Sequence, residues 1–503
     1  MEAKSEQQNQ PQYAVPLGLN YRLQIADAVP ASHNISQFLA SNASDFTENN
    51  NTIRINVNSG GFLDLRKAVL EFDLKNTTST DAVYLDGSAE CVVSRVRILS
   101  SDGSELERID SYSQLASVLD QYSSSDGASR IKSIQKGSPK YIDETASIEE
   151  ATGASGGAAL TATASAQAYQ SGLKVNVENI YTGSTGQTTV KVSGQGGVGY
   201  SQLQCDKLNT GVKRHYSFGL KCGFFNPITA KLLPAGSPFQ VELTLGKAAE
   251  CLVNKDGTNA VSYVLTNAEL HIPTIIVNDP EYMQSVNARL ASGVSFKCNS
   301  YNHFVNTTSG NDGKDTIQIS ARARSLKGLM TILRKQSKIS SDDDFKLSKR
   351  SIQYVSDYQY KINSTNYPVD RVAISTDVTA GGTPSGTRLP ISSTNSLNVS
   401  EAFNHAMRLM GGLNSNSADC LIGVESFSQS ENANNNGTGI LAVDLSAFSD
   451  GSVNSGINTL NNGVVQLEFT KTAACDAILQ VDTYSVHELI IMRSPAGVLQ
   501  SMY

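Results

Sequence analysis

The feature that most constrains the fold is a stretch of alternating side chains from Gly60 to Asn76, which reads GGFLDLRKAVLEFDLKN. Apolar and charged residues alternate through its second half, a pattern typical of a half-buried strand. Similar runs lie before it, at 53–57, and after it, at 91–99, and Ser101-Asp102-Gly103 predicts a hairpin turn into a further run. Four successive strands with no helix between them favour stacked antiparallel sheets over an α/β enzyme.

The length and composition of the chain indicate how many such stacks to expect. With 503 residues, it is too long for one ordinary β-sandwich and about right for two. Only 17% of the residues are charged and 39% are hydrophobic, and the balance of small polar residues is typical of loop-rich β proteins. We therefore expect an all-β chain with two tandem eight-stranded antiparallel β-sandwiches, short helices and long loop insertions.

Shifts in composition predict where the chain divides. Asp279 followed by Pro280 is a helix-start signal, and it separates two clusters of strand-like runs. A low-complexity stretch with few charges interrupts the first cluster, and a polar loop interrupts the second. Inside the first insertion, the runs 173–181 and 188–194 predict a hairpin. The predicted organisation is an extended N-terminal arm (1–50), a first sandwich (51–278) with an exposed insertion (123–211), a linker helix (279–292), and a second sandwich (293–503) with an exposed loop (377–398).

Positions in the middle of the alternating runs are the predicted core of both sandwiches. They share an apolar side chain flanked on either side by outward-facing residues. These structural core residues are Leu70, Phe72, Leu74, Val241, Leu243, Phe296, Leu467 and Phe469.

Motifs that could carry chemistry are weak in this chain. Residues 194–199 fit a dinucleotide fingerprint, but no good helix and no suitably placed acid follow them. Residues 153–157 fit a nucleophile elbow, but they lie in low complexity. The six histidines lack zinc-binding spacing. The acidic cluster Asp342, Asp343 and Asp344 is a candidate calcium ligand set without the spacing of a calcium loop. We predict no catalytic residues and no cofactor.

Charge and cysteine content limit the partners. The net charge is −7, and the first 50 residues contain only two basic side chains, so a basic genome-binding arm is missing. The basic residues between 322 and 338 are a minor candidate for a genome-facing patch. Seven widely spaced cysteines favour reduced core thiols of a protein made inside the cell. The N-terminus is polar, without a secretory signal, and no apolar run is long enough to span a membrane.

Three segments carry a resemblance to a known family. GGFLDLRKAVLEFDL, VVSRVRILSSDGSELERIDSY and HYSFGLKCGFFNPITAKLLPAGSPFQVELTL resemble strands of the first jelly roll in major capsid proteins of polinton-like and virophage-related DNA viruses. Tyr367-Pro368 is similar to a Tyr-Pro pair in that family's second domain. The resemblance implies two tandem jelly rolls and a homotrimer that forms a pseudo-hexameric capsomer of an icosahedral virion. It also implies contacts with neighbouring capsomers, with penton and minor capsid proteins, and outward towers built from the two insertions.

Other function classes stay open at the level of sequence. A capsid protein of an RNA virus with shell and projection domains is one, although the missing basic arm counts against it. A carbohydrate-binding or adhesin protein is another, although it would usually place Trp on its binding face, and Trp is absent. A polysaccharide-degrading enzyme would need two carboxylates across a groove, which need not be adjacent in sequence.

Overall fold

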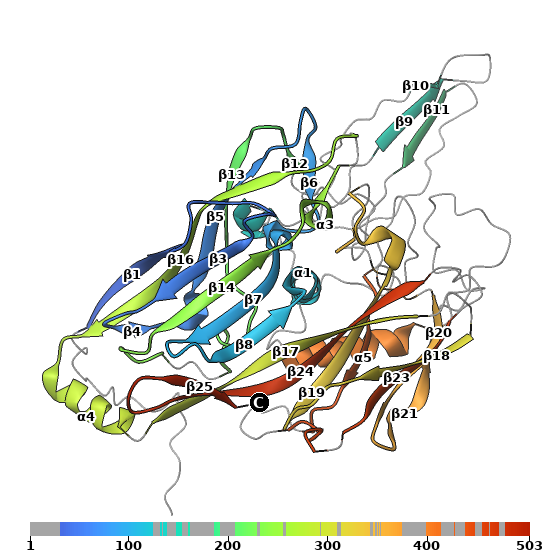
Figure 1. Cartoon of the computed structure of the whole chain (residues 1–503). Coiled ribbons are helices and arrows are strands. Elements are labelled where there is room, and N and C mark those ends of the chain that lie inside the picture. The colour runs from blue at the N-terminus through green and yellow to red at the C-terminus, as the bar shows by residue number, and fades with distance from the viewer. Residues whose placement is uncertain are drawn as a thin grey trace, which may run out of the picture.

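The fold is described from a computed structural model of the chain (Figure 1). The described residues are 31–123, 131–132, 134–137, 147–152, 159–160, 186–191, 207–228, 232–254, 258–291, 293–308, 313–342, 346–347, 350, 352, 354–374, 399–413, 427, 438–447, 455–461, 463–471 and 478–502. Among them, no helix combines the length and the apolar character needed to cross a bilayer.

The first sandwich contains two antiparallel sheets, of six and four described strands, that face each other (Figure 1). The first sheet has the order β1 (Ala31–Leu39), β16 (Tyr263–Val277), β5 (Val69–Asn76) and β13 (Lys213–Phe218), with β2 (Asp45–Phe46) and β4 (Phe62–Leu63) also paired to β16. The second has the order β3 (Thr52–Val57), β14 (Phe239–Leu245), β7 (Val93–Ser100) and β8 (Glu105–Asp110). Alternate residues of β3 and β5 are buried, as the sequence pattern requires.

The second sandwich repeats this arrangement with longer strands. One sheet has the order β17 (Val294–Thr307), β24 (Leu479–Arg493), β19 (Leu326–Lys335) and β22 (Leu441–Asp444), with β25 (Leu499–Met502) also paired to β24. The other has the order β18 (Gly313–Ile319), β23 (Val465–Lys471), β20 (Val355–Ile362) and β21 (Thr365–Ala373). The predicted fold class, two tandem antiparallel β-sandwiches, is confirmed, and within the described residues the sheets have six and four strands in the first sandwich and five and four in the second.

Short helices and two small sheets complete the described structure. The small sheets have the orders β12 (Lys207–Leu208), β6 (Val83–Leu85), β15 (Leu252–Val253), and β10 (Ala159–Leu160), β9 (Ser147–Thr152), β11 (Gly186–Lys191). The helices are α1 (Tyr112–Ser123), α3 (Ala248–Cys251), α4 (Pro280–Leu290) and α5 (Ser400–Leu413), with 3₁₀ turns at Leu65–Lys67, Ala89–Val92 and Gln336–Lys338. Helix α4 joins the two sandwiches, and Oδ1 of Asp279 accepts a hydrogen bond from the Glu281 N–H at its start (3.0 Å).

One expected segment, the N-terminal arm, differs from the structure, and two others lie outside the described residues. Residues 31–39 of the predicted arm pair with β16 along their whole length and form the edge of a sheet. Sequence patterns do not predict this strand, because both of its faces are largely exposed and its apolar residues therefore do not alternate. In the insertion, β11 pairs with β9, and residues 173–181, the first run of the predicted hairpin, lie outside the described residues. The loop 377–398 also lies outside them.

Candidate functional site

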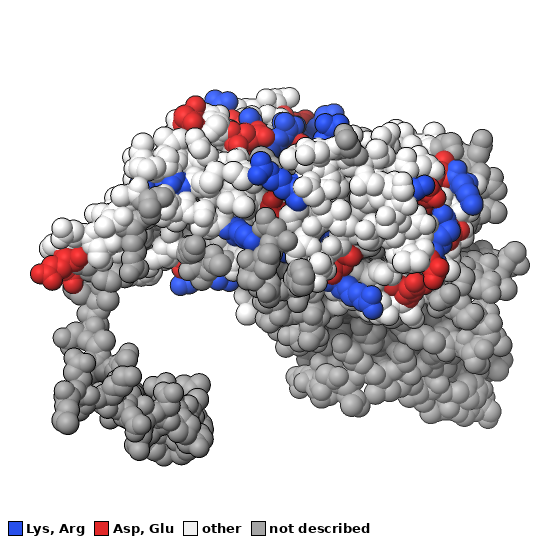
Figure 2. Space-filling view, turned by 90° about the horizontal axis from the view of Figure 1, so that it is seen from below, with Lys and Arg blue, Asp and Glu red and all other residues white. Residues whose placement is uncertain are grey.

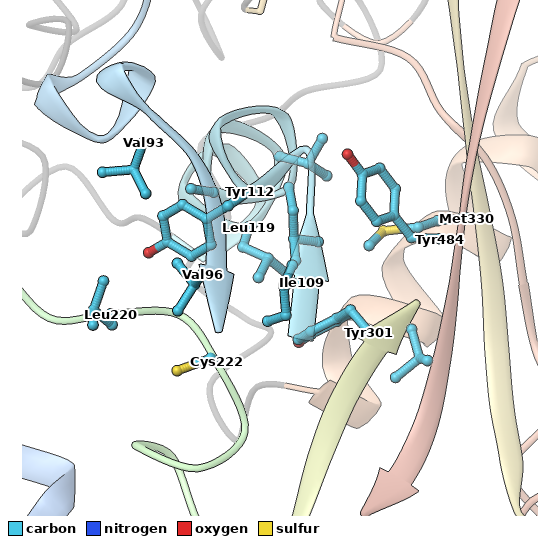
Figure 3. Close-up of a cluster of buried hydrophobic side chains, with 14 of the residues drawn as sticks. Val93, Val96, Ile109, Tyr112, Leu119, Leu220, Cys222, Tyr301, Met330 and Tyr484 are labelled. Atoms are coloured by element: carbon cyan, nitrogen blue, oxygen red, sulfur yellow. The ribbon is translucent and has the colours of Figure 1, made fainter. Parts of the chain in front are cut away.

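The two sandwiches meet in a continuous buried junction, which is the main candidate for function in a chain whose described part shows no catalytic constellation. Figure 3 shows this junction, where Ile109 at the end of β8 lies near Tyr301 of β17, and Tyr484 of β24 lies next to Met330. All four side chains are buried. The Tyr484 hydroxyl donates to the Ser111 carbonyl at the start of α1 (2.9 Å). One apolar core therefore runs through both sandwiches.

A buried carboxylate, Glu107 of β8, ties three elements together at this junction. The N–H groups of Gly223 and Phe224, in the loop after β13, each donate to it at 2.8 Å. The Ser300 hydroxyl of β17, in the other sandwich, donates at 2.6 Å. Burial raises the pKa of Glu107, and these three hydrogen bonds oppose the rise. The carboxylate fixes the position of the second sandwich against the first, because hydrogen bonds are directional where apolar contact is not.

Aromatic side chains surround the same loop. The ring of Phe224 lies 4.9 Å from that of Phe239 and 6.2 Å from that of Phe296, measured between centroids. Phe239 belongs to β14 of the first sandwich and Phe296 to β17 of the second. Edge-on pairs at these separations add to the stabilisation from burial alone. A short loop thus joins both cores.

A second buried charge cluster lies on the sheet of the second sandwich that adjoins the junction. Asp482 of β24 accepts hydrogen bonds from Arg334 (2.8 Å) and pairs with Nε2 of His303 (2.9 Å). The His303 ring stacks on Tyr484, with centroids 4.7 Å apart. Burial alone would raise the pKa of Asp482, but Arg334 and His303 outweigh it and hold that pKa below its usual range. The cluster connects three neighbouring strands beside the inter-sandwich contact.

A third charge network anchors the beginning of the insertion. Lys136 and Lys221 both contact Glu90, at 2.6 and 2.7 Å, and both contact Asp120 of α1. The Tyr112 hydroxyl donates to the other oxygen of Glu90 (3.1 Å). The buried Lys136 and the half-buried Lys221 therefore balance the two buried carboxylates, which makes burial of these charges tolerable. The segment at 134–137 is fixed to the sandwich where the insertion starts.

In the first sandwich, the outer face of the sheet β3-β14-β7-β8 carries a row of alternating positive and negative side chains. Glu242 of β14 lies between Arg54 (3.0 Å) and Arg97 (2.8 Å), and Arg97 also contacts Glu105 (2.8 Å). Desolvation would raise the pKa of Glu242, but the two arginines outweigh it and lower that pKa. In the face drawn in Figure 2, basic and acidic side chains are likewise interspersed rather than separated by sign. Such faces suit contact with a protein better than attraction to a polyanion.

Strand β1 offers a free sheet edge. Among the described strands it pairs along its length only with β16, so one row of its backbone groups is open. Large apolar side chains are exposed on this strand and its neighbour: Ile35 of β1 is 57% exposed, Leu39 of β1 64% and Ile276 of β16 48%. An open edge with apolar side chains is a surface for pairing with another chain.

The residues singled out in the sequence lie in different places. All eight predicted core residues are buried. Asp342 is half-buried and its carbonyl accepts from the Asn254 N–H (2.7 Å), whereas Asp343 and Asp344 lie outside the described residues, as do both glycine motifs. The basic residues between 322 and 338 lie in different surroundings: Arg334 pairs with Asp482, and Lys327 is buried near Asn299. The four described cysteines are buried and none of them forms a disulfide: Cys91, Cys222, Cys251 and Cys298.

The junction itself was missed at the sequence level. Glu107 sits in the run ELERID, where it looks like any outward charge of an alternating strand. The one usable signal was in β24, whose run LQVDTYSVHELIIMR shows little alternation and is buried on both faces over most of its length. A strand of that kind predicts a sheet covered on both sides.

Comparisons with known proteins show which fold this is. Neither protein-family models nor curated proteins gave a match. Among solved structures, a chain of the PBCV-1 virus capsid superposes with a TM-score of 0.55 at 9% identity, covering 96% of this chain and 99% of that one. The Faustovirus major capsid protein (TM-score 0.53, 10%, 94% and 92%) and a chain of the Sputnik virophage (0.53, 10%, 97% and 92%) are also similar. The chain therefore has the double jelly-roll fold of these viral capsid structures, as the sequence resemblance implied.

Proposed function

We propose that this chain is the major capsid protein of an icosahedral DNA virus. Its role is mechanical: each sandwich is a rigid wall element, and three chains contribute six such elements to a pseudo-hexameric capsomer of the virion. The observation that carries the proposal is the likeness to capsid chains over nearly the whole length, with both sandwiches in one chain. Closed rings are the expected product of repeated head-to-tail contacts between identical subunits.

Two features of the molecule support this role. The junction around Glu107 holds the sandwiches in one relative orientation, and a lattice subunit needs such rigidity because its contacts must repeat identically. The exposed apolar edge of β1 supplies a surface for contact between protomers. Neighbouring capsomers, penton proteins and minor capsid proteins are the further partners of such a subunit, and the virion is its location.

Sedimentation and electron microscopy of the purified protein test the proposal. Three chains of 53.7 kDa give a particle of about 161 kDa, which should resist dilution and moderate salt because obligate interfaces are large and mostly apolar. Negative-stain images should show particles of roughly hexagonal outline. A monomer at micromolar concentration that binds glycans and never forms rings would instead support the adhesin alternative. Nuclease-sensitive particles held together by RNA would support the RNA-virus alternative.

A further inference from the structure

A group of histidine and glutamate side chains lies on the outer face of the first sheet, away from the junction. Register places Glu71 of β5 directly opposite Glu269 of β16. Like charges opposite each other on neighbouring strands destabilise a sheet unless something compensates them. Among the described residues, neither carboxylate pairs with Lys or Arg, and their ionic partners are histidines.

The donor atoms of this group converge. Nε2 of His271 lies 3.4 Å from Oε1 of Glu269 and 3.9 Å from Oε2 of Glu71, and one ligand atom from each of the three residues lies within 4.8 Å of the others. Nε2 of His215, on β13, lies 3.4 Å from Oε2 of Glu71. Tetrahedral Zn²⁺ with bonds of about 2.0–2.2 Å places its donors roughly 3.3–3.6 Å apart, so Glu71, Glu269 and His271 need little movement. Of these three residues His215 contacts only Glu71, so its ring must turn toward the other two to become the fourth ligand.

Neighbouring side chains orient these donors. Nδ1 of His215 bonds to Oδ1 of Asp73 (2.9 Å), which leaves Nε2 as a lone-pair donor toward Glu71. The Ser217 hydroxyl donates to Glu71 (3.3 Å), and the Gln37 amide donates to the second oxygen of Glu269. A carboxylate behind a histidine is the usual outer shell of a metal-binding imidazole. Nε2 of His271 is buried and makes no hydrogen bond within the described part of the chain.

We propose that Glu71, Glu269, His271 and His215 form a binding site for a divalent transition metal, Zn²⁺ foremost. Two carboxylates and two imidazoles match the ligand preference of Zn²⁺, and two negative charges balance the ion. The bound ion connects β13, β5 and β16 across the outer face and converts the Glu71–Glu269 repulsion into shared coordination. Its role is structural, because four protein ligands leave no open position for a substrate. The site does not depend on whether the chain builds a shell.

Metal titration of the full-length protein tests the site. Bound metal is first removed with a chelator. Titration with Zn²⁺ in competition with a chromophoric chelator should then show one ion bound per chain. Co²⁺ bound in place of Zn²⁺ should give the visible absorption of a tetrahedral site. His271→Ala should weaken Zn²⁺ binding more than tenfold, and Asp73→Asn roughly 10- to 100-fold through lost orientation of His215. The matched control is His405→Ala, because His405 forms an isolated pair with Glu401 on α5 (3.9 Å) and should leave the affinity unchanged.

Thermal unfolding separates stabilisation by the bound metal from the effect of a substitution on the metal-free chain. Without metal, Glu71→Gln should raise Tm, because it removes the repulsion from Glu269. With excess Zn²⁺ the order should reverse, since only the native chain gains from the ion. Absence of stoichiometric Zn²⁺ binding, equal affinity in the native chain and His271→Ala, or a Glu71→Gln chain that stays the more stable one in Zn²⁺ would each overturn the proposal.

Discussion

Replacing Glu107 by alanine should destabilise the junction between the sandwiches more than the loss of an exposed ion pair would. The substitution leaves two buried N–H groups, of Gly223 and Phe224, without an acceptor. Each unsatisfied buried donor costs about 1–3 kcal/mol, so the free energy of unfolding should fall by about 2–6 kcal/mol. The substitution also removes the cost of burying a carboxylate, which is the cause of the raised pKa of Glu107. We therefore expect a loss in the lower part of that range.

Urea denaturation, followed by tyrosine fluorescence and by circular dichroism, measures this loss. The matched control is Glu105→Ala on the same strand, whose side chain is 35% exposed and pairs with Arg97. That substitution should cost about 0–1 kcal/mol, as exposed pairs do. In Glu107→Ala we also expect the two probes to separate into two transitions, because the sandwiches lose the directional hydrogen bond between them that Glu107 makes with Ser300. Equal losses in the two variants would refute the reasoning.

The pH dependence of Glu107 has a definite sign. A carboxyl group whose pKa is raised on folding contributes stability that is fully present below the unfolded pKa and is lost as pH rises through the folded pKa. The native chain should therefore lose stability relative to Glu107→Gln as pH rises from acid toward neutral, in a matched series of urea titrations. A difference between the two chains that stays constant with pH would contradict the assignment of Glu107 as a desolvated carboxyl group.

The remaining predictions concern the core, acid sensitivity and assembly. Phe72→Ala should cost about 2–5 kcal/mol in urea denaturation, because its fully buried ring packs edge-on against a neighbouring ring, whereas Val369→Ala, at an 81% exposed position, should be near neutral. Burial lowers the pKa of His487 to about 4, so the native chain should lose about 3 kcal/mol as pH falls from 6.5 to 4, and His487→Gln should flatten that part of the profile. Ile35→Asp combined with Leu39→Asp should shift sedimentation from trimer to monomer, and an unchanged trimer would exclude β1 from the contact between protomers.

Local alternation was sufficient to predict the strands of each sandwich. In β5 and β14 the apolar side chains face one way, and Leu70 and Leu243 are buried where the pattern places them. The hairpin at Gly103 was also predictable, because its φ of +84° favours glycine. These features depend on residues close together in sequence, so periodicity and turn chemistry capture them.

Features that depend on distant segments could not be predicted in this way. The group of Glu71, Glu269 and His271 depends on the pairing of β5 with β16, nearly two hundred residues apart in the chain. Strand β1 lacks a buried face, so nothing in its side chains marks it as a strand. Pairing across such distances follows from how whole sheets assemble, and a short window of sequence does not contain that information.

Burial of Glu107 also bears on why a wall of two sandwiches stays in one arrangement. Apolar contact between Phe224 and Phe296 stabilises the junction but would tolerate sliding, because the hydrophobic effect has no preferred direction. A buried carboxylate with three donors in fixed positions opposes such sliding, since a shift would leave the carboxylate without its hydrogen bonds. The raised pKa of Glu107 shows that burial of its charged form offsets part of the stability that these hydrogen bonds supply. For a subunit that must repeat the same contacts around a closed shell, a defined orientation of the two sandwiches is worth more than the stability given up.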